Sequence, residues 1–154
     1  MAEFIKQSWV FPVVQSVHLI GLTVLVGSIC LVDLRLLGVG RGVGRGVGRC
    51  QHIADFASAV APWTKRGLLT VLITGPLMFG SDLTRYLNNP AFLLKMGLLA
   101  VALAGQFTLH RRAVRDAGTS TALTQKIAAV LSLIVWSSIV LAGRAIADFD
   151  IRIV

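Results

Sequence analysis

Long apolar runs alternate with short charged clusters along this chain of 154 residues. The first run, WVFPVVQSVHLIGLTVLVGSICLV, covers residues 9–32 and contains no Asp, Glu, Lys or Arg. At about 1.5 Å of rise per residue, a helix of that length can cross a bilayer. Further apolar runs occupy residues 61–80, 91–109 and 123–143, and the few lysines and arginines in them can extend toward the membrane surface. The pattern predicts four membrane-spanning helices.

The fold class that follows is an all-α, polytopic membrane four-helix bundle, with residues 1–154 forming a single four-span domain. Residues 38–49 repeat Gly-Val-Gly-Arg and form a linker, which is either flexible or a docking arm for a partner subunit. Residues 50–63 are amphipathic and predict a short interfacial helix that ends at Pro62, the expected first-turn proline of the second span. Residues 81–95 predict a second short surface helix before the third span.

Basic residues set the expected orientation. They concentrate in two of the three connections and beside them: Arg35, Arg41, Arg45, Arg49, Lys65, Arg66, Arg111, Arg112, Arg115 and Lys126. Both connections lie on one side, which the positive-inside rule makes cytoplasmic, so both termini lie outside a bacterial inner membrane. The formal net charge of +8 then reflects this rule and attraction to lipid headgroups, and we expect no nucleic-acid binding. The expected partners are the lipid bilayer and other membrane subunits or further copies of this chain.

His18 is the most informative single residue, because it lies within the first span. An ionisable side chain there is costly and needs a functional or structural reason. Gln15 and Gly21 lie about one helical turn before and after it, so we place them on the same face as candidate pocket residues. His18 could ligate a metal, relay protons or serve packing. On the third span, Lys95, Gln106 and His110 lie on one stripe of the helix, because the spacing from Lys95 to Gln106 is about three turns and that from Gln106 to His110 about one turn.

His18 and His110 are an obvious pair of ligands, but their depths differ. Counting from the helix centres separates them by roughly 15 Å along the membrane normal, so they cannot hold one iron. His18 would therefore ligate alone or with a residue of the outer half such as Lys95, or the chain would hold two sites. A weaker metal candidate is the inner set Cys50, His52 and His110. A disulfide is not expected, because neither Cys30 nor Cys50 lies on the oxidising side.

Four segments carry a family resemblance over nearly the whole chain: VQSVHLIGLTVLVGSICLVDLRLLG, PWTKRGLLTVLITGPLMFGS, NPAFLLKMGLLAVALAGQFTLH and VLAGRAIADF. They resemble an uncharacterised family of small bacterial four-helix membrane proteins. More distantly, a histidine in the first helix and a lysine at the start of the third are similar to four-helix membrane protoporphyrinogen oxidases and to the membrane part of D-type copper-resistance proteins. In the oxidases these positions are linked to heme b. The resemblance therefore points to His18 and Lys95.

The function expected from these observations is heme b binding in the membrane, with electron transfer or membership of a redox complex. His18 would bind the iron, and Gly21 would let a flat macrocycle approach the helix backbone. Two alternatives remain open. One is a cofactor-free accessory subunit of a larger membrane complex. The other is a copper-handling protein, for which Met78, Met96 and His18 are candidate ligands. Whether the chain is an enzyme stays open.

Overall fold

The structure is a computed structural model that describes residues 9–39, 53–81, 83–106 and 122–151. Within these residues the chain is entirely helical, which confirms the all-α expectation. Four long helices and one short helix follow one another along the chain: α2 (Val10–Leu37), α3 (Ile53–Ser81), α4 (Leu83–Leu87), α5 (Pro90–Gly105) and α7 (Ala122–Ile151).

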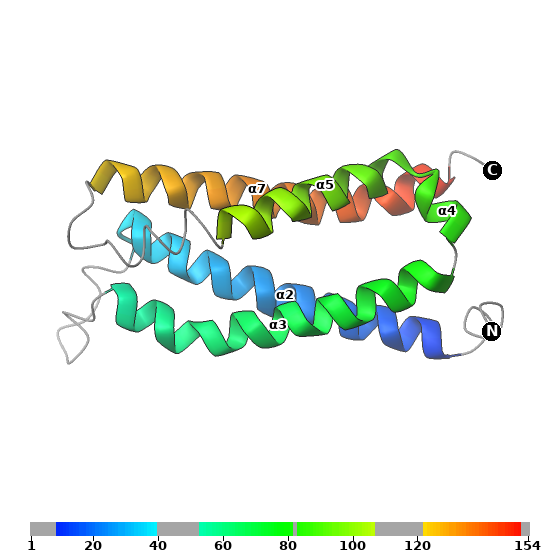
Figure 1. Cartoon of the computed structure of the whole chain (residues 1–154), viewed down its shortest axis with the longest axis horizontal. Coiled ribbons are helices and arrows are strands. Elements are labelled where there is room, and N and C mark those ends of the chain that lie inside the picture. The colour runs from blue at the N-terminus through cyan, green and yellow to red at the C-terminus, as the bar shows by residue number, and fades with distance from the viewer. Residues whose placement is uncertain (1–8, 40–52, 82, 107–121, 152–154) are drawn as a thin grey trace.

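The four long helices form two pairs that lie against each other (Figure 1). Helix α2 packs on α3, α5 packs on α7, and α2 also contacts α7, which joins the pairs. A cluster of buried apolar side chains draws on all four helices: Leu25, Ile29, Val71, Ala102, Trp136 and Ile139. The beginning of α2 and the end of α7 lie at the same end of the bundle, as an even number of long helices requires (Figure 1).

Small residues bring α2 and α3 into close contact. A Cβ atom added to Gly67 would lie 2.6 Å from the Leu25 backbone nitrogen and 2.9 Å from the Gly21 carbonyl oxygen. A Cβ atom at Gly21 would lie 2.7 Å from Cγ2 of Thr70. Because these positions lack side chains, the two backbones approach closely at this level. One consequence is that residues of α2 and α3 at equal depth can exchange hydrogen bonds.

The start of α3 corrects one prediction. Over the described part of this stretch, residues 53–63, no separate interfacial helix forms, because α3 runs without a break from Ile53 to Ser81 and contains Pro62 in its interior. A proline there leaves the carbonyl of Ser58 without its helical partner. Both Ser58 and Pro62 are exposed, so water or lipid headgroups can satisfy that carbonyl. The helix therefore tolerates the proline that the sequence pattern placed at a helix start.

The connection between α3 and α5 follows the prediction of a short surface helix. Helix α4 covers Leu83–Leu87, and α5 then begins with Pro90 at its first turn. The Asn89 side chain caps α5 by accepting hydrogen bonds from the backbone N–H groups of Ala91 (3.0 Å) and Phe92 (3.3 Å). Its Nδ2 atom donates to the Ile146 carbonyl oxygen of α7 at 3.3 Å. Asn89 thus fixes the start of α5 against the far part of α7.

Two helices are long and apolar enough to cross a membrane by length and composition, namely Val10–Leu37 and the part of α7 from Leu123 to Ile146. Helix α5 is apolar but shorter over the described residues. Helix α2 extends beyond the predicted end of the first span at residue 32 and stops at Gly38, which has a φ of 95°. The backbone N–H of Val39 donates to the carbonyl of Leu34, which closes the helix end.

Candidate functional site

His18 lies at the interface between α2 and α3, where its ring is half-buried. Its Nδ1 atom is 2.7 Å from Oγ1 of Thr74, and that hydroxyl is 2.6 Å from the Thr70 carbonyl oxygen, to which it donates. Since the hydroxyl hydrogen is used toward Thr70, Oγ1 accepts the proton of Nδ1. The bond therefore fixes the tautomer of His18, with Nδ1 protonated and Nε2 carrying a lone pair.

Lys95 approaches the same level from α5. Its Nζ atom would lie 3.4 Å from a Cβ atom added to Gly143, so the lysine side chain packs across α7 where that helix has no side chain. The positive charge of Lys95 lies near enough to His18 to repel a protonated ring. We call His18, Thr74, Lys95 and Gly143 the outer polar layer, where outer means nearer the end of the bundle at which α2 begins and α7 ends (Figure 1). This layer receives one residue from each long helix.

The core cluster lies next to this layer on the inner side. Leu25 follows His18 by two helical turns on α2, and Trp136 precedes Gly143 by two turns on α7, and both are almost fully buried. The outer polar layer is therefore backed by apolar side chains rather than by further polar groups at that depth. An ionisable pair at such a boundary sits in a region of low dielectric constant, where its interactions are strong.

The two neighbours of His18 differ from their expected roles. Gln15 is exposed on the surface of α2, whereas His18 is half-buried, so the two side chains do not line one interior space. Gly21 is buried, but the space beside it is filled by Thr70 of α3. Gly21 therefore serves the contact between α2 and α3, and it does not open the backbone to a flat ligand. A glycine nearer to the histidine is Gly75, whose added Cβ atom would lie 3.7 Å from Cε1 of His18.

Of the polar stripe predicted on the third span, Lys95 and Gln106 lie in the described residues. Lys95 is half-buried, and Gln106 places its Oε1 atom in the interior, where it meets no hydrogen-bond partner among the described residues. His110, the next member, lies outside the described residues, as do Cys50 and His52 of the weaker metal candidate. Cys30 is a free, half-buried thiol.

The copper alternative needs two methionines near His18. Met96 follows Lys95 directly but is 45% exposed on the outer surface of α5, so it points away from the outer polar layer. Met78 lies one turn beyond Thr74 on α3 and is half-buried. Met96 is therefore not part of the cluster around His18.

Thr74 is the functional residue that sequence reasoning missed. Threonines one turn apart on an apolar helix, as Thr70 and Thr74 are, ordinarily serve helix packing, so the pattern did not single Thr74 out. The signal that could have found it is depth, because α2 and α3 are antiparallel and both positions lie about two turns inside the outer end. A polar residue opposite a buried histidine is the natural partner for one ring nitrogen.

A protein-family comparison matches residues 8–149, which is nearly the whole chain, to a family of unknown function, DUF6644. The chain belongs to this family. Searches of curated proteins and of solved structures found no match. The expected membership of an uncharacterised family is thereby confirmed.

In this DUF6644 member, no group of three or more His, Cys, Asp or Glu side chains gathers around one point within residues 9–39, 53–81, 83–106 and 122–151. That part of the chain therefore offers no cage for a bare metal ion built from these residue types. A heme needs fewer protein ligands than a bare metal ion, because the macrocycle supplies four ligands to the iron and the protein supplies one or two. The oriented Nε2 atom of His18 and the amine of Lys95 fit that requirement by their chemistry.

Proposed function

We propose that this chain is a multi-pass membrane protein of four spans. The observation that supports the proposal is the distribution of apolar side chains, since each long helix exposes large ones to its surroundings. Ile20 of α2 is 65% exposed, Leu69 of α3 is 60%, Val101 of α5 is 60% and Leu141 of α7 is 69%. Contiguous apolar surface on every helix is unfavourable in water and suits lipid.

The polar side chains support the same placement. Asp33, Asn89 and Gln125 are buried inside the bundle rather than exposed on its flanks. The end of α2, the start of α3 and the start of α7 lie at one end of the bundle (Figure 1). Arg35 and Lys126 lie near these helix ends, and Lys65 and Arg66 lie near the middle of α3. We assign that end to the cytoplasmic face of a bacterial inner membrane. Both chain ends then lie on the opposite side.

We further propose that the outer polar layer binds heme b. The observation that carries this proposal is the hydrogen bond from His18 to Thr74, since a ligating histidine ordinarily donates its other ring nitrogen to a fixed acceptor. His18 would bind the iron through Nε2, and Lys95 in its neutral form would supply a second ligand. Heme b supplies reversible one-electron transfer when bound. The role suggested for the chain is electron transfer or membership of a redox complex.

The test is the heme content of the protein purified in a mild detergent, measured by its Soret absorbance and as the pyridine hemochrome. We expect about one heme per chain in the wild type and almost none in His18→Ala. Gln15→Ala is the matched control, because Gln15 is one turn away and exposed, and it should keep its heme. A wild-type protein without heme, and unable to take up added hemin, would overturn the proposal and favour a cofactor-free accessory subunit.

A further inference from the structure

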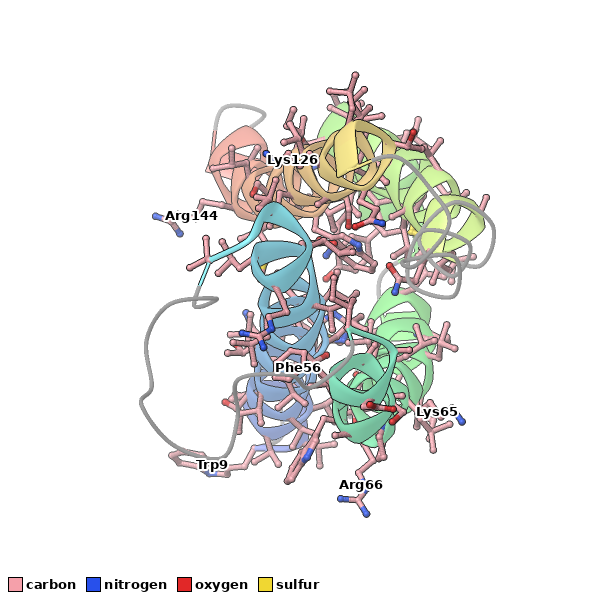
Figure 2. All side chains as sticks on the ribbon, turned by 90° about the vertical axis from the view of Figure 1, so that its left-hand side faces the viewer. Trp9, Phe56, Lys65, Arg66, Lys126 and Arg144 are labelled. Atoms are coloured by element: carbon pink, nitrogen blue, oxygen red, sulfur yellow. The ribbon has the colours of Figure 1, made fainter. Side chains whose placement is uncertain are left out.

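Two adjacent cations interrupt the apolar surface of α3. Lys65 and Arg66 are both exposed, and they point outward from the helix in different directions (Figure 2). Trp63, one turn before Arg66, is 56% exposed. Among the described residues no acidic side chain pairs with Lys65 or Arg66, so their charges are not neutralised by that part of the protein.

The depth of these residues follows from the length of α3. Arg66 lies fifteen residues before the end of the helix at Ser81, which corresponds to roughly 22 Å of helix. The hydrocarbon core of a bilayer is about 30 Å thick. If Ser81 marks the outer boundary, the Cα atom of Arg66 lies inside the hydrocarbon region and its side chain must extend to the inner headgroups. Trp63 is one turn nearer the inner headgroups.

The side chain of Arg66 takes this direction in the structure. Its guanidinium carbon lies 5.4 Å from the centre of the Trp63 ring, so the side chain runs back along α3 toward the inner end. The cation–π contact holds the guanidinium group beside an aromatic ring at the expected level of the headgroups. A hydrogen bond between Ser28 and Thr64 (2.9 Å) fixes this turn of α3 against α2.

We propose that Trp63, Lys65 and Arg66 form a binding site for the phosphate group of an anionic phospholipid in the inner leaflet. The proposal rests on the membrane placement proposed above. A guanidinium group matches the geometry of phosphate oxygens, the lysine adds a second positive charge, and the indole N–H of Trp63 is a further donor. An anionic lipid is favoured over a zwitterionic one because Lys65 and Arg66 place two positive charges at this turn of α3 and the described residues provide no compensating carboxylate.

The test compares lipid retention by purified full-length protein in native mass spectrometry, with phosphatidylglycerol and phosphatidylcholine supplied at equal concentrations. We expect the wild type to retain phosphatidylglycerol preferentially. The double variant Lys65→Gln/Arg66→Gln should lose this preference by on the order of fivefold for each charge removed. Arg144→Gln is the matched control, since it removes one exposed cation from α7 near the opposite end and should leave the preference unchanged.

Four results would overturn the site. Equal retention of phosphatidylglycerol by the wild type and the double variant would show that these cations do not select lipid. If Arg144→Gln lost the preference for phosphatidylglycerol as strongly as the double variant, the effect would be a general one of net charge. Loss of an associated protein with unchanged lipid retention would assign the surface to an acidic partner. Recovery of the wild type outside the membrane fraction would overturn the membrane placement as well, which separates that failure from a failure of the lipid site.

Discussion

At the scale of single residues, the hydrogen bond between His18 and Thr74 determines what the site can do. A buried imidazole without a fixed partner could present either ring nitrogen, and its orientation would be poorly defined. Thr74 removes that freedom, because its own hydroxyl hydrogen is directed to the Thr70 carbonyl oxygen at 2.6 Å. The histidine could be singled out from the sequence by its depth in an apolar run. The threonine could not, because buried threonines more often contact a neighbouring helix or their own backbone.

Thr74→Val tests this arrangement, because it keeps the shape of the side chain and removes the acceptor for Nδ1. We expect hemin to bind about tenfold more weakly, since partners of a ligating histidine typically contribute at least that factor. The measurement is an absorbance titration of the purified apoprotein with hemin. Thr70→Val is the control, because it leaves the Thr70 carbonyl in place and its own hydroxyl bonds only to the Arg66 carbonyl. Equal affinity in wild type and Thr74→Val would remove Thr74 from the site.

At the scale of the helices, the sequence predicts that each long helix exists, but it does not predict every residue at which a helix begins or ends. The length of the apolar runs predicts each long helix, and the pair Asn89–Pro90 predicts the start of α5 almost to the residue. The start of α3 was missed because Pro62 is a common helix-start signal, and only its position on an exposed face allows the helix to continue through it. The role of Gly21 was missed for a related reason, since a sequence does not reveal which side chain lies opposite a glycine.

Gly67→Ala tests the close contact of α2 and α3. The new methyl group would lie 2.6 Å from a backbone nitrogen and 2.9 Å from a backbone carbonyl oxygen, so the helices must move apart. We expect a loss of about 1–3 kcal/mol in the free energy of unfolding, the usual range for overpacking a tight contact. Thermal unfolding in detergent provides the measurement. Gly97→Ala on α5 has open space around it and should be neutral or stabilising. Comparable losses in both variants would contradict a specific contact at Gly67.

At the scale of the whole molecule, the arrangement of α2, α3, α5 and α7 explains how residues distant in the sequence meet. Thr74 is 56 positions from His18, and Asn89 is 57 positions from Ile146, yet each pair is joined by a hydrogen bond. His18 lies in the first half of α2 and Lys95 in the first half of α5, and both helices begin at the same end of the bundle (Figure 1). Membership of the DUF6644 family does not assign an activity to the chain, since the function of that family is unknown.

Cysteine labelling tests the orientation. In a background with Cys30→Ser and Cys50→Ser, we expect Asn88→Cys to react with an impermeant thiol reagent in intact cells and Gly44→Cys to be protected. The reason is the excess of basic residues around the connection that contains Gly44. Permeabilised cells provide the control, because both cysteines should then react. Labelling of Gly44→Cys alone in intact cells would reverse the topology and place His18 in the inner half.

Rescue of His18→Gly by free imidazole is the most direct measurement of the central claim, that Nε2 of His18 binds heme iron. The substitution removes the ring and leaves space beside Gly75 that free imidazole can occupy. We predict that purified His18→Gly shows no Soret band of bound heme when mixed with hemin, and that millimolar imidazole restores a low-spin spectrum close to that of the wild type. A wild-type protein that binds no heme would contradict the claim. So would a His18→Gly protein whose heme spectrum matches the wild type without imidazole.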